Sequence, residues 1–428
     1  MKTGLLIISL IFVIVTALVS FVNKKSDDPK NNDHNNPLQI VAADSNRAKK
    51  MDANNISTYF RSNGGFNRNP NTDNSGFEWP KGSNKFVRYA SGLWIGAIVG
   101  NDTLVSIAEY SYEYLPGYID NNGNPQGKDD PAYRIYKINK GDSVSSDYSN
   151  WPVNQGAYTD SKGKPYQMGN QTMFYSSTDG YPEAHGNRAG HTLPLKADIL
   201  QTNWCYNQYY NILDDVIFME FRIINKSNIP WTRCFFGIWT DDDLGSATND
   251  AVGSDSILSL GFTFNSSNSD GIYGAAPPAV GFLLLKGPSV PSFGDTAIYH
   301  NPPGSNNLIL KPNHKNLRFS TITLVNEIPG YVDPANYHET YNLLQGIGSS
   351  GNSWINPLTG QVTKFTFSGD PETQTGWVMT TGDDRRSFAS TGPVNVNPGD
   401  TQTIVIAQIM ARGTSNTNSV TKLKQTSR

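Results

Sequence analysis

Cysteine is almost absent from this chain. Only two of its 428 residues are cysteines, Cys205 and Cys234. This scarcity excludes a disulfide-stapled scaffold, and neither cysteine has histidines at the spacing of a zinc finger. Two interpretations of the pair remain open. The thiols could form a disulfide in an oxidising exterior, or they could be buried in neighbouring strands as small apolar side chains.

Charge is scarce as well. Asp, Glu, Lys and Arg make up 17% of the residues, the formal net charge is −3 and the pI is about 6.1. A protein that binds nucleic acid or an anionic membrane surface through its charge shows a basic surplus. We therefore expect no nucleic-acid partner. We expect membrane contact only through the apolar residues 5–22, if they are retained.

Common catalytic and cofactor motifs are also missing. We find no nucleophile elbow, P-loop, dinucleotide fingerprint or H-E-x-x-H helix. Glu183, His185 and His191 form the one histidine cluster, but its H-x5-H spacing matches no common zinc motif. We interpret these histidines as surface or loop residues. No catalytic or cofactor-binding residue is predicted, so the sequence favours a protein that is not an enzyme without excluding one.

Turn-forming and aromatic residues are abundant instead. The chain has 39 Gly, 25 Pro, 21 Tyr and 8 Trp. Together with few Lys, Glu and Ala, this composition is typical of many short strands joined by turns. The tryptophans could be core residues, or some could lie exposed and stack on sugar rings.

The clearest strand signals lie in three segments. Residues 93–109 predict a hairpin, because Gly100 and Asn101 supply a turn between two apolar runs. Val216–Ile224 and Trp231–Trp239 are β-branched and aromatic and flank a turn, so we expect them to pair antiparallel, with Phe218 or Met219 buried. These signals predict an all-β fold of antiparallel β-sandwiches with long loops and one or two short helices.

Two segments are the candidates for these short helices. Asp333 is predicted to cap the first, with Pro334 at its first position and Gly346 after its end. Asn418 and Ser419 predict a second helix start close to the C-terminus. Because the chain stops within about two turns, a length that is marginal without packing, we expect the sequence to be truncated there.

The N-terminal region predicts export. Lys2 precedes the apolar run of residues 5–22, which is typical of a secretory signal and is also just long enough to span a bilayer. We divide the chain into a signal peptide or membrane anchor (1–22), a polar linker (23–45), a loop-rich β-region (46–190) and a β-sandwich domain (191–428). The expected location is extracellular or on the outer cell surface, with membrane anchoring as the alternative.

An acidic loop is the most specific chemical signal. Residues 239–255 carry carboxylates and amides on a stretch with two glycines. Such a loop suits calcium, which prefers several oxygen ligands at flexible geometry. A solvated acidic turn is the alternative interpretation. The predicted metal ligands are Asp241, Asp243, Asn249, Asp250 and Asp255. Further along, residues 383–386 (DDRR) are interpreted as an internal ion-pair loop rather than a phosphate site.

Several stretches resemble a family of large secreted β-proteins of Bacteroidota-type bacteria, usually exported by type IX secretion and mostly uncharacterised. The resemblance covers nearly everything after about residue 46. It is carried by GGFNRNP and SGFEWPKGS (64–83), YASGLWIGAIV (89–99), DDVIFMEFRIINKS (214–227), FGIWTDDDLGSATNDAVGSDSILSLGF (236–262), YGAAPPAVGF (273–282) and DRRSFASTGPVNVNPGDTQTIVIAQIMARG (384–413). The family implies no established activity and no catalytic residues. Its members continue into further β-domains and a sorting domain, which this sequence lacks.

Taken together, these observations favour a secreted or cell-surface β-sandwich protein with a structural, adhesive or ligand-binding role and calcium stabilisation. The alternative is a carbohydrate-binding or glycoside-hydrolysing module of the cell exterior. The expected partners are a cell-surface polysaccharide or protein.

Overall fold

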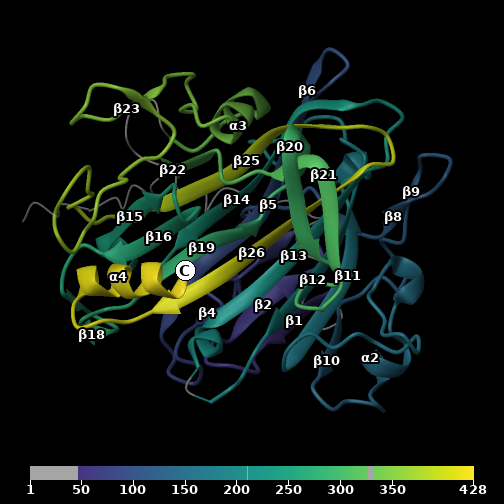
Figure 1. Ribbon diagram of the computed structural model, residues 1–428, viewed down its shortest axis with the longest axis horizontal. Coiled ribbons are helices and arrows are strands. Elements are labelled where there is room, and N and C mark those ends of the chain that lie inside the picture. Colours follow the sequence, from purple (N-terminus) through teal and green to yellow (C-terminus); the bar gives the residue numbers. More distant parts are fainter. Residues whose placement is uncertain (1–46, 210, 326–331) are drawn as a thin grey trace, which may run out of the picture.

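The computed structural model describes residues 47–209, 211–325 and 332–428, so the predicted signal segment and linker lie outside the described residues. Strands make up 45% of the structure and helices 10%. Two nine-stranded antiparallel sheets carry most of the strands and pack face to face (Figure 1). The predicted all-β sandwich fold with short helices is therefore confirmed.

The first sheet has the strands of the chain's N-terminal third at one end and late strands at the other. Two further strands, β4 and β6, pair with β5 beside the main path. In spatial order the path is β1 (Ala48–Met51), β2 (Thr58–Arg61), β3 (Gly65–Phe66), β5 (Phe86–Val99), β14 (Trp231–Asp242), β25 (Arg386–Val396) and β22 (Thr321–Val325), with β4 at Phe77–Glu78 and β6 at Asp102–Ile107.

The second sheet is built in the same mixed way, and β7 (Leu115–Pro116) pairs with its β11. Both sheets contain strands from each side of residue 190, so the boundary expected there does not separate the sheets. The spatial order is β10 (Tyr136–Asn139), β11 (Gln171–Thr178), β12 (Ala197–Cys205), β13 (Val216–Asn225), β26 (Thr401–Ala411), β19 (Ala279–Lys286), β16 (Leu260–Asn265) and β15 (Asp250–Asp255).

The hairpin predicted over residues 93–109 is present. β5 pairs antiparallel with β6, and Val99 lies opposite Asp102 across the turn. Gly100 adopts a φ of 63°, a left-handed conformation that glycine takes without a steric penalty. Local turn chemistry therefore determines this pairing.

The predicted pairing of 216–224 with 231–239 is wrong. β13 pairs with β12 and β26 in the second sheet, whereas β14 pairs with β5 and β25 in the first. The chain crosses between the sheets after Asn225, whose side-chain amide donates to the carbonyls of Ile229 (3.1 Å) and Val396 (2.9 Å). Because both strands have an apolar face, placing them in opposite sheets lets those two faces pack against each other.

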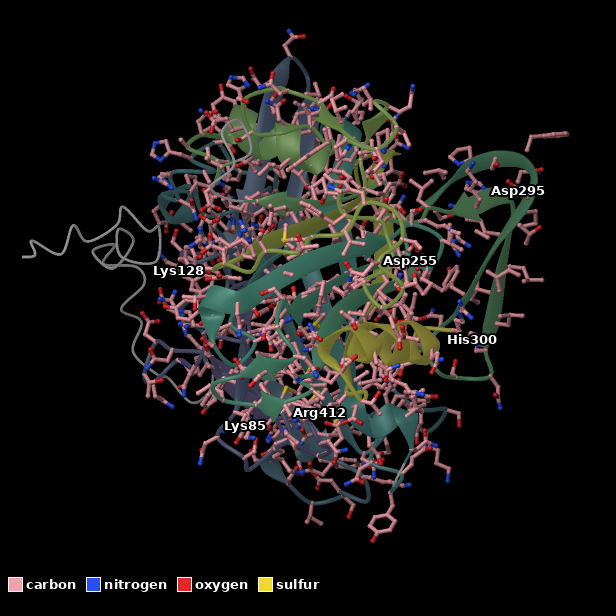
Figure 2. The ribbon with its side chains drawn as sticks, turned by 90° about the vertical axis from the view of Figure 1, so that its left-hand side faces the viewer. Lys85, Lys128, Asp255, Asp295, His300 and Arg412 are labelled. Carbon is pink, nitrogen blue, oxygen red and sulfur yellow. The ribbon has the colours of Figure 1, made fainter. Side chains whose placement is uncertain are left out.

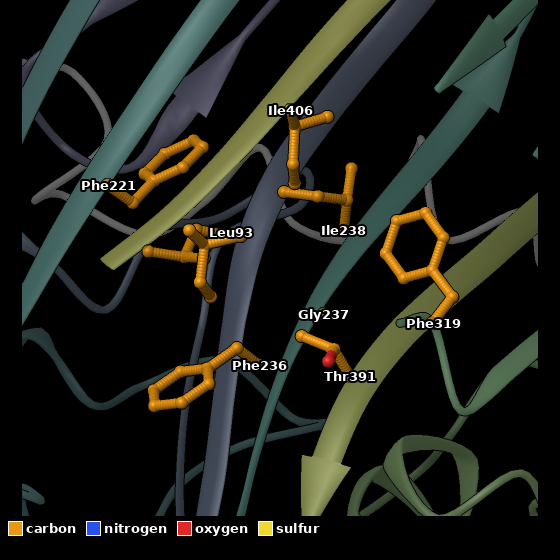
Figure 3. Close-up of a pocket in the computed structure, with 9 residues that line it drawn as sticks. Leu93, Phe221, Phe236, Gly237, Ile238, Phe319, Thr391 and Ile406 are labelled. Atoms are coloured by element: carbon orange, nitrogen blue, oxygen red, sulfur yellow. The ribbon is translucent and has the colours of Figure 1, made fainter. Parts of the chain in front are cut away.

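The core lies between the two sheets. Alternate residues of β13, including Met219 and Phe221, point into it and are fully buried, so the predicted burial of Met219 is confirmed. Figure 3 shows a small apolar cavity in this core, lined by residues of both sheets such as Leu93, Phe236 and Ile406. Its volume of about 10 Å³ is at the lower limit for one water molecule. It therefore holds no ligand site.

A buried polar network also joins the sheets. Arg88 of β5 forms an ion pair with Asp242 (2.8 Å) and donates to Gln408 of the opposite sheet (3.0 Å). Asp242 also accepts a hydrogen bond from Thr263 of the second sheet. Arg88 and Asp242 are 1% and 2% exposed. Such a pair is costly to break from one side, because the remaining charge stays buried.

In the described part of the chain three short α-helices lie outside the sheets: α2 (Ser146–Ser149), α3 (Tyr337–Leu344) and α4 (Asn416–Thr426). Asn336 caps α3, because its side chain accepts from the amides of residues 338 and 339, so the cap predicted at Asp333 is wrong. Asp333 instead accepts a hydrogen bond from Arg386 (2.6 Å). α4 begins two residues before the predicted start and packs on β16, β19 and β26.

A long hairpin, the arm, consists of β20 (Ser289–His300) and β21 (Leu308–Asn316) and forms a separate two-stranded sheet. Figure 1 shows it in front of the second sheet, and Figure 2 shows it standing out from the body, with Asp295 and His300 on it. Further short pairs join β8 (Tyr118–Ile119) to β9 (Pro125–Gln126), β17 (Ser269–Asp270) to β18 (Gly274–Ala275) and β23 (Trp354–Ile355) to β24 (Val362–Thr363).

Both cysteines are free, buried thiols. Cys205 lies in the second sheet and Cys234 in the first, so they are not in neighbouring strands of one sheet. Burial raises the pKa of Cys205 to about 12. Within the described ranges, none of the helices combines the length and the hydrophobicity needed to cross a bilayer.

Candidate functional site

The acidic loop places two of its predicted ligands together. Asp241 is the next-to-last residue of β14 and lies on the same side of the extended chain as Asp243. β25 pairs with β14 so that Arg386 lies opposite Asp241, and Asp384, two residues before Arg386, also joins them. Carboxylate oxygens of Asp241, Asp243 and Asp384 lie within 4.8 Å of one another. We call these three residues the acidic cluster.

The other predicted ligands have different surroundings. Asp250 is buried at the start of β15 and accepts from the amide of Leu244 (3.1 Å). Burial, together with the nearby charges of Asp242 and Asp243, raises the pKa of Asp250 well above its ordinary value. Asp250 therefore lies beside the acidic cluster, although its carboxylate is engaged with backbone and amide groups.

Asn249 and Asp255 are not in the acidic cluster. The side chain of Asn249 donates to Asp270 (3.3 Å) and accepts from Asn265 (2.5 Å). Asp255 lies at the far end of β15, about 16 Å from Asp250 at the usual rise per residue. There it faces Lys424 of α4 at 3.4 Å. The structure thus brings together two of the five predicted ligands and adds Asp384, which the sequence analysis had assigned to an ion-pair loop.

Arg386 supplies positive charge to the acidic cluster. Its guanidinium lies 2.6 Å from Asp333, 3.7 Å from Asp241 and 3.9 Å from Asp384. The Tyr110 hydroxyl accepts from Arg386 (2.7 Å) and donates to Asp241 (2.8 Å). Although burial acts to lower the pKa of Arg386, Tyr110 and the surrounding carboxylates raise it above its ordinary value. The ion-pair interpretation of residues 383–386 therefore agrees with the structure.

The histidine cluster does not assemble. His191 is exposed and His185 lies in a loop, which agrees with the surface-or-loop interpretation, but His185 is buried. The ring of His185 lies 3.7 Å from Glu113 and 3.8 Å from Asp179. Burial, opposed by two backbone N–H groups, raises the pKa of Glu113 to about 8. The sequence could not show this burial, because Glu113 is distant from His185 along the chain.

A groove opens between the arm and the outer face of the second sheet. Its floor comes from β12, β13, β19 and β26, and its wall from β20 and the loop that follows. The cavity volume is about 290 Å³, close to the lower limit for a small-molecule site. The lining residues are Trp204, Tyr206, Phe218, Leu285, Lys286, Ile298, Tyr299, His300, Pro303, Gly304 and Val405. We call this feature the aromatic groove.

Strand register builds the aromatic floor. Trp204 lies opposite Phe218 across β12 and β13, and their rings stack at 5.3 Å with an angle of 9° between planes. Tyr206 meets the edge of Phe218 at 5.8 Å. Trp204 is buried, whereas Phe218, Tyr206 and Tyr299 are partly exposed. The groove therefore presents the rings of those three residues on a rigid base.

One end of the groove is polar. A β-bulge after Leu284 allows Lys286 to pair with Val405 on the outer face. The Lys286 ammonium donates to the carbonyl of Thr403 (2.8 Å) and lies 4.7 Å from the centre of the Tyr299 ring. Burial lowers the pKa of Lys286 to about 8, although the nearby carboxylate of Glu220 acts in the opposite direction.

Glu220 is occupied by other groups. It accepts a hydrogen bond from the Tyr158 hydroxyl (3.2 Å) and lies 3.5 Å from the guanidinium of Arg222. Burial raises the pKa of Glu220, and Arg222 counteracts that effect. The groove was not predicted, because the arm that closes it gave no strand signal in the sequence. Alternation within 216–224 did indicate that Phe218 and Glu220 share a face.

Comparisons with known proteins give little similarity. No protein-family model and no curated protein matches the chain. Among solved structures, a polysaccharide lyase is similar over 87% of this chain and 35% of its own, at a TM-score of 0.32 and 10% identity. A GH36 α-galactosidase from Geobacillus stearothermophilus, in complex with stachyose, matches over 89% and 42% at a TM-score of 0.30 and 10% identity. The chain spans less than half of each, and TM-scores this low carry no argument about activity.

Proposed function

We propose that this chain is an extracellular β-sandwich protein that binds a carbohydrate in the aromatic groove. The main support for this proposal is that the partly exposed rings of Tyr206, Phe218 and Tyr299 surround one concave site. A sugar ring presents apolar C–H bonds on its face, and an aromatic ring offers a flat apolar surface with a negative centre. Such a site combines stacking with a few polar groups that orient the ligand.

The groove favours binding over hydrolysis. None of its described lining residues is a carboxylate, and the neighbouring Glu220 is engaged by Tyr158 and Arg222. Most glycoside hydrolases use two carboxyl groups that flank the scissile bond. A ligand-binding or adhesive role therefore needs fewer additional assumptions than a glycosidase role.

A glycan-array screen followed by calorimetry tests this proposal. Phe218→Ala and Tyr299→Ala should each weaken binding about three- to tenfold, the range expected for one lost aromatic contact. Tyr118→Ala is the matched control, since Tyr118 is 38% exposed and stacks on Tyr133 outside the groove. If no glycan binds the wild-type protein, or if the control loses affinity equally, the proposal is wrong.

Export to the cell exterior belongs to the same proposal. It is supported by Lys2 and the apolar run of residues 5–22. Cell fractionation with and without these residues is the test. The full chain should leave the cytoplasm, and a chain that begins at residue 23 should stay there.

Calcium stabilisation is a second proposal, motivated by the acidic cluster. Three carboxylates within 4.8 Å favour a bound cation, since like charges at this distance disfavour one another. Arg386 offsets part of this repulsion, so a weak site is expected, on the order of 10⁻⁴–10⁻³ M as in extracellular modules. Calcium at ten times its dissociation constant would then add about 1.4 kcal/mol to the free energy of unfolding.

Thermal unfolding with calcium or a chelator is the measurement. Calcium should raise the midpoint of the wild type and leave Asp243→Asn nearly unchanged. Asp255→Asn is the matched control, because Asp255 lies at the far end of β15 and should keep the response. An unchanged wild-type midpoint would contradict calcium stabilisation.

A further inference from the structure

The polar end of the aromatic groove points to the kind of carbohydrate that fits it. Lys286 and Tyr299 line the groove at that end, and Lys311 lies on the arm strand that pairs with β20. Lys286 and Lys311 are close enough to interact electrostatically. Two lysines therefore lie near each other at a site whose described lining residues include no acid.

Lys286 keeps bonding capacity for a ligand. An ammonium group has three donors, and the described contacts of Lys286 are the Thr403 carbonyl (2.8 Å) and the face of Tyr299 (4.7 Å). Among the described residues no carboxylate forms an ion pair with this ammonium within 4.0 Å. Glu220 influences it electrostatically, but Glu220 itself accepts from Tyr158 and lies 3.5 Å from Arg222. A partly buried cation in this position is stabilised by an anion that approaches through the groove.

We infer that the aromatic groove selects a glycan with an anionic group, a carboxylate or a sulfate, and that this group binds Lys286. The inference rests on the proposed carbohydrate-binding function and adds the charge of the ligand. In this arrangement Phe218, Tyr206 and Tyr299 contact the sugar face. Lys286 receives the anion at the end of the groove, 4.7 Å from the Tyr299 ring centre.

Titration gives a distinctive signature. Lys286 binds an anion only in its protonated form, and its pKa of about 8 is low enough for moderate alkali to remove the charge. Affinity for the anionic glycan should therefore fall as the pH rises from about 7 to 9.5. Charged and titratable groups that face Lys286 from the packed elements are Glu220 and Arg222 of β13, Tyr299 and His300 of β20, Lys311 of β21 and Tyr158.

The experiment compares matched ligands by calorimetry at low salt. One pair is trigalacturonate and its methyl ester, and the other is a sulfated galactan trisaccharide and its unsulfated counterpart. The charged member of at least one pair should bind tenfold or more tightly than its neutral match, and the two pairs distinguish carboxylate from sulfate. Raising the salt concentration should narrow this difference, because screening weakens partly exposed charges.

Two variants separate charge from packing. Lys286→Met should reduce the affinity for the charged glycan to that of the neutral match. Lys286→Arg should keep the preference and make it independent of pH between 7 and 9.5, since arginine stays protonated. Unfolding midpoints confirm that both variants fold, and Lys286→Gln replaces Lys286→Met if the latter does not.

The outcomes are distinct. Equal affinity for charged and neutral glycans, or a preference for charge that survives in Lys286→Met, overturns the inference and leaves carbohydrate binding intact. If only neutral glycans bind on the array, the inference is likewise overturned and carbohydrate binding stays intact. If no glycan binds, carbohydrate binding itself fails. A tenfold preference that is lost in Lys286→Met and kept in Lys286→Arg supports the inference.

Discussion

The two faces of the second sheet differ although the same strands build them. The inner face packs against the first sheet, and its β13 residues Met219 and Phe221 are fully buried. The outer face is covered in pieces by α4, by the loops around α2 and by the arm. Between those pieces Phe218 stays partly exposed. The continuous packing on the inner face stabilises the fold, whereas the gaps in the packing on the outer face leave room for the aromatic groove.

The polar groups of the two faces follow the same division. On the inner side Arg88, Asp242 and Gln408 bond one another across the sheets, so their hydrogen-bonding capacity is largely used within the protein. On the outer side Lys286 has one described hydrogen bond, to Thr403. The buried network of Arg88, Asp242 and Gln408 therefore connects the two sheets. Lys286, which has hydrogen-bond donors left, is suited to bind a ligand in the groove.

The largest expected effect comes from the inner face. Phe221→Ala should lower the free energy of unfolding by about 3–5 kcal/mol, because it removes a fully buried ring and leaves a cavity beside a core that already has a small void. Urea denaturation measures this change. A loss below about 1 kcal/mol would show that the inner face is not the main source of stability.

Buried carboxylates give a second, pH-dependent effect. On the outer face the cations Arg222 and Lys286 lie near Glu220. Glu113, in contrast, accepts from the backbone N–H groups of Ile107 and His191 and lies 3.7 Å from His185. Its pKa is raised from 4.5 to about 8, so the folded protein holds a proton that the unfolded chain releases. The contribution of Glu113 to the free energy of unfolding is complete below about pH 4.5 and is lost as the pH rises to about 8.

Glu113→Gln should therefore flatten the fall in stability between pH 5 and 8, by up to about 1.4 kcal/mol per pH unit. Urea denaturation at several pH values is the measurement. Glu183→Gln is the control, because Glu183 lies at the surface and bonds Lys128 at 2.7 Å. If both variants keep the wild-type slope, another group such as Asp179 or Asp198 controls it.

The smallest effect on stability is expected on the outer face. Phe218→Ala removes a half-buried ring and should cost about 1–2 kcal/mol, less than Phe221→Ala on the same strand. The same variant should lose glycan affinity, whereas Phe221→Leu, which keeps the core filled, should retain it. The pair thus separates the two faces with one denaturation series and one binding series. Equal losses of stability in Phe218→Ala and Phe221→Ala would contradict the proposed difference between the outer and inner faces.

Much of the local structure could be predicted from the sequence. Alternating side chains in 216–224 placed Met219 and Phe218 on opposite faces, because strand geometry has a period of two residues. Gly100 determined the β5–β6 turn, and Gly346 follows α3 with a φ of 78°. These features depend on neighbours within a few residues, so they do not require knowledge of the fold.

Contacts between distant residues depended on tertiary structure. Asp384 joins Asp241 because β25 pairs with β14, and the sequence holds no signal for that partner. The same limitation produced the wrong hairpin between β13 and β14, since two apolar strands can pair in one sheet or face each other across two. The aromatic groove exists because the arm folds over the outer face. The sequence thus determined which side chains share one face of a strand. Only the tertiary structure decided against which other strands each face packs, because burial of apolar surface is non-directional and does not itself select a partner.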